Sequence, residues 1–104
     1  FTEFLSVAAQ RDYASAWSML TPRYQEKYLG YDNFVRFWET VDGAGVREWQ
    51  SIGTVPAGQT VRMWLWFGRR ADGTVSNEIV EVDITQDSVT AVVLIDDYRY
   101  QGVG

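Results

Sequence analysis

The spacing of apolar residues changes near residue 43, and no other feature of the sequence constrains the fold more. Before residue 43, apolar residues recur every three or four positions, as they do on one face of a helix. After it, β-branched residues and strict alternation dominate, as in strands. Helices followed by strands within 104 residues predict a single α+β domain over residues 1–104.

Four short helices are predicted in the first part of the chain. Their limits are indicated by residues that cap helix ends or interrupt helices. None is long enough to be stable alone in water, so all four must pack on something else. The expected boundaries are a first helix over Thr2 to Ala9, Asp12 as the N-cap of the second, Thr21-Pro22 at the start of the third, Gly30 as its left-handed end, Asp32 as the N-cap of the fourth, and Asp42 to Gly45 as its stop.

Four strands are predicted in the second part. The connections between them are short, which is typical of an antiparallel meander. We therefore expect the helices to pack on one face of a strongly bent four-stranded antiparallel sheet. The expected strands are Val46 to Thr54, Thr60 to Arg69, Val75 to Thr85 and Val89 to Tyr98, joined by turns at Pro56-Ala57-Gly58, Ala71-Asp72-Gly73 and Gln86-Asp87-Ser88.

The second strand is apolar on both faces for much of its length, although a strand covered on one face should alternate apolar with polar residues. Trp64 and Trp66 share the face opposite the core. Three interpretations stay open: both rings pack on neighbouring side chains of an open sheet, they form a homodimer or partner interface, or one of them lines a cavity. The core face of this strand is expected to hold Val61, Met63, Leu65 and Phe67.

Aromatic residues on the helices permit two interpretations. They fill the core between helices and sheet, or they wall a cavity that accepts a small apolar molecule. The candidate ligand-binding residues are Tyr13, Trp17, Phe34 and Trp38 on the helices, with Met63, Leu65 and Phe67 on the sheet.

Charge and composition exclude several function classes. Nine basic and 14 acidic residues give a net charge of −5, which disfavours binding to nucleic acid or to an anionic membrane. The chain has no cysteine and no histidine, so it lacks a thiolate nucleophile, an imidazole base and the commonest metal ligands. We expect no metal and no cofactor. The wholly apolar runs are far shorter than the ~20 residues of a membrane span, so any membrane contact would require a tether outside this chain.

One catalytic arrangement stays open. Asp96 and Asp97 are neighbours on a strand and should face opposite sides, so they cannot share a proton. Either carboxylate beside Tyr13 or Tyr98 would resemble the acid–base pair of an enzyme that abstracts a proton next to a carbonyl.

Three stretches resemble the NTF2-like superfamily, the cystatin-like α+β cones. They read Asp12-Tyr13-x-x-Ala16-Trp17-x-x-Leu20-Thr21-Pro22, Gly30-Tyr31-x-x-Phe34-x-x-Phe37-Trp38 and Leu94-Ile95-Asp96-Asp97-Tyr98. Val93 stands where this group commonly has tryptophan. The resemblance implies a bent sheet wrapped around helices, with a cavity between them. This variety is similar to small extracytoplasmic domains of bacterial membrane-anchored Ser/Thr kinases and of lipoproteins.

Three functional hypotheses follow. The leading one is a non-catalytic domain that binds a small apolar molecule or a protein partner, excised from a longer protein and tethered outside the cytoplasm. The second is a homodimerisation module that uses Trp64 and Trp66 on the open sheet face. The third is a small isomerase or dehydratase that uses an Asp–Tyr pair.

Overall fold

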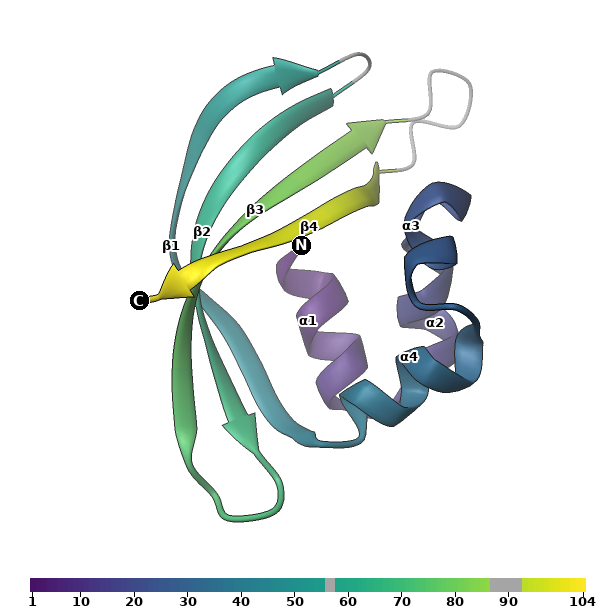
Figure 1. The fold of residues 1–104 in the computed structure, drawn as a ribbon, viewed down its shortest axis with the longest axis vertical. Helices are drawn as coiled ribbons and strands as arrows, with labels where there is room; N and C mark the ends of the chain where they lie inside the picture. The colour runs from purple at the N-terminus through teal and green to yellow at the C-terminus, as the bar shows by residue number, and fades with distance from the viewer. Residues whose placement is uncertain (56–57, 87–92) are drawn as a thin grey trace.

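A computed structural model describes residues 1–55, 58–86 and 93–104. It contains four helices and four strands in the predicted order, with the helices on the inner side of a bent sheet (Figure 1). The elements are α1 (Thr2–Ala9), α2 (Tyr13–Ser18), α3 (Pro22–Lys27), α4 (Tyr31–Trp38), β1 (Val41–Val55), β2 (Gly58–Arg69), β3 (Val75–Gln86) and β4 (Val93–Val103).

Two of the predicted helix caps are confirmed. The Asp12 carboxylate accepts a hydrogen bond from the Ser15 backbone N–H at 3.4 Å, and the Thr21 hydroxyl accepts one from the Tyr24 N–H at 3.3 Å. Each bond satisfies one of the N–H groups that a helix start leaves without an intrahelical partner. Pro22 follows Thr21 as the first helical residue, where its missing N–H is harmless.

The junction between α3 and α4 differs from the prediction. Leu29, not Gly30, adopts the left-handed helical conformation, with φ of 59°. Gly30 has φ of 125° and is the N-cap of α4, so Asp32 lies in the first turn and is not the cap. The backbone needs two consecutive positive φ values here, and the glycine takes the one that is the less accessible to other residues.

The sheet is the predicted antiparallel meander, with strand order β1-β2-β3-β4. Strand β1 begins at Val41 instead of Val46, so the segment predicted to stop α4 is already part of the sheet. Gly58 begins β2 and Gln86 ends β3, although both were predicted as turn residues. The rest of those two turns (56–57 and 87–88), together with the predicted start of the last strand (89–92), lies outside the described residues.

Irregular pairing accompanies the bend of the sheet. The register between β1 and β2 shifts three times, between Val41 and Gly43, between Val46 and Glu48, and between Ser51 and Gly53. The register between β3 and β4 shifts twice. An extra residue on one strand bends that strand and increases its twist. The resulting concave face holds the helices, whereas no described helix covers the convex face (Figure 1).

The core lies between the concave face and the helices. The predicted inward face of β2 is confirmed, because Val61, Met63, Leu65 and Phe67 are all buried. From the helical side, Phe34 and Trp38 of α4 are also buried, and the rings of Trp38 and Phe67 lie 6.1 Å apart.

A short parallel bridge joins the helical half to β4. The Ile95 N–H donates to the Met19 carbonyl at 2.8 Å, and the Thr21 N–H donates to the Ile95 carbonyl at 2.9 Å. The chain between α2 and α3 therefore follows the outer edge of β4 as a short extra strand would. This attachment fixes the position of the α2–α3 connection beside Ile95 of β4.

Candidate functional site

The main candidate site is a pocket beside the bridge to β4, at the start of α1. Its volume is about 290 Å³. Apolar side chains of α1, of the α2–α3 connection and of strands β3 and β4 form most of its wall. The lining residues are Phe1, Glu3, Phe4, Met19, Ile84, Val93 and Ile95.

A second and more open pocket adjoins the first. The two share Ile84 and Val93, and the second has a volume of about 640 Å³. Its other lining residues carry hydroxyl or amide groups or no side chain: Thr54, Gly58, Gln59, Thr85 and Gln86. We call the two pockets together the mouth groove. It has an apolar floor near α1, and the described residues of its rim, near the ends of β1 and β2, are polar and uncharged.

Most of the predicted ligand-binding residues fill the core and line neither pocket of the mouth groove. Trp17 is half-buried and packs edge-on against Phe34, with ring centroids 5.1 Å apart. The other core members are Phe34, Trp38, Met63, Leu65 and Phe67, all buried. The structure therefore brings these residues together as packing partners. Phe4, which packs against Phe34 and Trp38, separates them from the first pocket.

Tyr13 lies at a third pocket, apart from the mouth groove. This pocket has a volume of about 450 Å³ and is lined by Arg11, Tyr13, Glu39 and Arg70. The Tyr13 hydroxyl is buried and finds no hydrogen-bond partner within the described part of the chain. The Arg70 guanidinium donates hydrogen bonds to the backbone carbonyls of Glu39 and Val41, at 3.1 and 3.0 Å.

The residues of the mouth groove carry a weak sequence signal. Phe1 and Phe4 belong to the apolar stripe of α1, and Ile84 and Ile95 continue the alternation of β3 and β4. These patterns indicate a buried face but not whether another side chain covers it. Ile84 and Ile95 both line the first pocket and pair with each other. Their pairing depends on the register shift between β3 and β4. That shift has no recognisable mark in the sequence.

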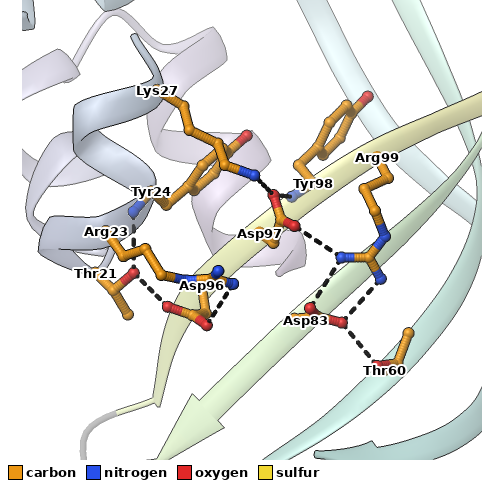
Figure 2. Close-up of polar contacts among 10 residues, drawn as sticks. All are labelled: Thr21, Arg23, Tyr24, Lys27, Thr60, Asp83, Asp96, Asp97, Tyr98 and Arg99. Carbon is orange, nitrogen blue, oxygen red and sulfur yellow. Dashed lines mark hydrogen bonds and ion pairs between the residues drawn. The ribbon is translucent and has the colours of Figure 1, made fainter. Parts of the chain in front are cut away.

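The two adjacent aspartates are engaged by cations and not by tyrosine hydroxyls (Figure 2). Asp96 accepts hydrogen bonds from the Thr21 hydroxyl at 2.7 Å and from the Arg23 guanidinium at 3.0 Å. Asp97, which is buried, is bound by Lys27 and Arg99. The Tyr98 hydroxyl instead points to Glu78, at 3.5 Å.

The surroundings of Asp97 favour its ionised form. Burial raises the pKa of the Asp97 carboxyl, but hydrogen bonds from Lys27, Arg99 and a backbone N–H outweigh burial and hold the pKa below its usual range. Arg99 also donates two hydrogen bonds to the Asp83 carboxylate, at 2.9 and 3.0 Å. These bonds hold the pKa of the Asp83 carboxyl below its usual range. A general base that works near neutrality needs a raised pKa, so this geometry does not supply one at Asp97.

On the convex face, Trp64 and Trp66 are both half-buried. Trp66 lies over two glycines of β1: a Cβ atom placed on Gly45 would fall 2.5 Å from the indole nitrogen, and one on Gly43 would fall 3.2 Å from the ring. This ring therefore has a packing role within the sheet. The tryptophan with the larger exposed surface is Trp49, 64% exposed, whose strand partner Met63 faces the concave side.

In the described ranges, no group of three or more acidic side chains is arranged to hold a metal ion. No helix among the described residues has the length and apolar character needed to cross a bilayer. Comparison with known proteins gave no matching family model, no matching curated protein and no matching solved structure.

Proposed function

We propose that this chain is a non-catalytic binding domain of the NTF2-like type that holds a small apolar molecule in the mouth groove. The observation that carries the proposal is the 290 Å³ pocket, whose wall is formed largely by Phe4, Met19, Ile84 and Ile95. Small-molecule sites are typically concave and mostly apolar, with volumes of roughly 300–1,000 Å³. The two adjoining pockets reach this range together.

The position of the groove supports the same proposal. It lies between the start of α1 and strands β3 and β4. A bent antiparallel sheet with helices on its inner side (Figure 1) is also what the sequence resemblance implies. An apolar ligand placed there would cover Ile84, which is half-buried in the free chain, and Val93, which is exposed. Removing such surface from water contributes about 25 cal/mol per Å².

A thermal unfolding experiment tests the proposal. A ligand that binds only the folded state raises Tm, so decyl maltoside below its micelle concentration should raise the Tm that circular dichroism measures. Ile84→Gln should abolish this increase because it places an amide in the wall shared by both pockets. Ile79→Gln is the matched control, since Ile79 is a half-buried residue of the same strand that pairs with Trp64.

The outcomes separate clearly. An increase in Tm that Ile79→Gln keeps and Ile84→Gln loses supports a ligand in the mouth groove. No increase for the wild type, or an equal loss in both variants, would overturn the proposal. Each variant is compared with its own Tm in the absence of the probe, so a change in basal stability does not affect the comparison.

A second candidate function is homodimerisation through the convex face. The observation that favours it is that Trp64 and Trp66 share this face, which no described helix covers (Figure 1). Native mass spectrometry should then show a dimer for the wild type and a monomer for Trp64→Ser. Trp49→Ser, on the concave side, should stay dimeric. A monomeric wild type would exclude this function.

A further inference from the structure

The charge of the ligand can be inferred from the groove, if the proposed apolar binding function is correct. We propose that the mouth groove selects a cationic amphiphile: an apolar chain that ends in an ammonium group held at the first turn of α1. Among the described residues that line the two pockets, Glu3 is the one ionisable side chain. No lysine or arginine of the described ranges lines either pocket.

Glu3 is available to a ligand. It is exposed, and no hydrogen bond or ion pair within the described chain engages its carboxylate. On the same turn, Phe1 and Phe4 also line the pocket, and their rings stack with centroids 5.6 Å apart. A carboxylate beside aromatic rings suits an ammonium ion, because the ring faces and the carboxylate both attract positive charge.

Three basic side chains of α3 and β4 are already paired with carboxylates. Arg23 and Lys27 bind Asp96 and Asp97, and Arg99 bridges Asp97 and Asp83 (Figure 2). Once the α-amino group of Phe1 is acetylated, a ligand with an anionic head would meet Glu3 without a compensating cation among the described lining residues. The chain as a whole, with a net charge of −5, also repels anions.

One feature opposes this selection. The start of α1 has no side-chain cap, so its first N–H groups and the positive end of the helix dipole could attract an anionic head. The dipole amounts to roughly half an elementary charge at that end, whereas the Glu3 carboxylate carries a full negative charge. We therefore expect the carboxylate to dominate, and an anionic probe belongs in the test.

Isothermal titration at low salt with three probes of equal chain length tests the inference. Decyltrimethylammonium is cationic, decyl maltoside is neutral and decanoate is anionic. The chain is used with an acetylated N-terminus, which removes the α-amino charge from the first turn. The cationic probe should bind about fivefold more tightly than the neutral one, as expected for one exposed ion pair and one cation–π contact, and decanoate should bind most weakly.

Two variants locate the charge effect. Glu3→Gln should lower the affinity for the cationic probe to within about twofold of that for decyl maltoside, because the cation–π contact with the rings remains. It should leave the affinity for decyl maltoside unchanged. Glu26→Gln removes the same charge from an exposed position on α3 and should leave the preference intact. A preference that Glu3→Gln leaves at its full size, or that falls equally in both variants, would overturn the selection by Glu3.

The remaining outcomes separate this inference from the proposed function. If decanoate binds most tightly, the uncapped helix start governs the head group and the inference is wrong, although the groove still binds an apolar chain. If the neutral probe binds and Ile84→Gln abolishes its binding, the proposed function stands whatever the charge preference. If no probe binds the wild type, the proposed function fails and the inference fails with it.

Discussion

At the residue scale, Gly43 and Gly45 explain why β1 begins earlier than the sequence predicts. A pair of glycines after a helix is typical of a stop, and here the same glycines lie in a strand beneath the Trp66 ring. A glycine weakens a strand because it has no side chain to pack. The indole of Trp66, opposite Gly45 on β2, supplies the missing packing. Whether residues 43–45 form a turn or a strand thus depends on Trp66, about 20 positions away. The local sequence pattern around the glycines does not contain this information.

Gly45→Ala should therefore destabilise the protein. The added Cβ would lie 2.5 Å from the Trp66 indole nitrogen, a distance that forces the ring to move. Such overpacking costs about 1–3 kcal/mol. Gly53→Ala is the matched control in the same strand, because a Cβ there meets no atom within 4 Å. Urea unfolding measures both free energies, and equal values for the two variants would contradict the packing role of Trp66.

At the element scale, α3 is attached to the sheet by its own cap. The Thr21 hydroxyl accepts from the Tyr24 N–H and donates to Asp96 at 2.7 Å, while the Thr21 N–H binds the β4 backbone. The Thr21-Pro22 pair predicts the start of the helix but not its attachment to β4. The attachment requires the edge of β4 to lie beside this turn, which is a property of the tertiary fold.

Loss of that hydroxyl should cost more than an ordinary cap. Thr21→Ala removes both hydroxyl bonds and should lower the free energy of unfolding by about 1–2 kcal/mol, at the upper end of the range for N-caps. Thr21→Ser keeps the hydroxyl and should stay within about 0.5 kcal/mol of the wild type. Chemical unfolding followed by circular dichroism distinguishes them. If both variants lose the same stability, the methyl group and not the hydroxyl is responsible.

The network of Asp83, Asp97, Arg99 and Lys27 predicts how stability depends on pH. The pKa values of Asp83 and Asp97 lie below their ordinary value of 3.8 in the folded state. The unfolded chain therefore takes up protons first as the pH falls. The stabilisation is complete above about pH 5, begins to fall near the unfolded pKa and is lost as the pH falls through the folded values.

Asp97→Asn should make the acid decline in stability shallower. It should also lower stability at pH 7 by about 1 kcal/mol, because the partly exposed Lys27 and Arg99 both lose a charged partner. Urea unfolding at intervals between pH 7 and pH 3 measures the slope. Glu48→Gln, at an exposed position on β1, is the control and should leave the slope unchanged. The same slope in wild type and Asp97→Asn would show that Asp97 does not contribute to the acid decline.

At the scale of the whole molecule, the periodicity of the sequence alone predicts that helices come first and a sheet follows. The four helices, the meander and the inward face of β2 follow from local spacing. The candidate site could not be predicted in the same way. The sequence left open whether aromatic residues such as Phe34 and Trp38 fill the core or wall a cavity, and in the structure they fill the space between the layers. Whether bulky side chains enclose a cavity or occupy it is decided by packing, which periodicity does not report.

This filled core predicts that Phe34→Ala will affect the entire fold. Phe34 is fully buried, and its ring lies 5.1 Å from those of Trp17 and Tyr28 and 6.4 Å from that of Trp38. Replacing such a ring with alanine costs about 3–5 kcal/mol, a large part of the ~5–15 kcal/mol that stabilises a typical domain. Phe37→Ala, in the same helix but 45% exposed, should cost less than about 1 kcal/mol.

Cooperative unfolding, followed by near-ultraviolet circular dichroism and by fluorescence of the tryptophans, measures the effect of Phe34. Phe34→Ala should lose the near-ultraviolet signal or unfold at a much lower urea concentration, and Phe34→Leu, which keeps most of the volume, should still fold with a smaller loss. Because Phe34 contacts the other helices through aromatic rings and Trp38 joins it to Phe67 on β2, loss of its ring should loosen helices and sheet together. A variant whose helices melt while the sheet retains its own cooperative transition would instead show that the two layers are stable independently.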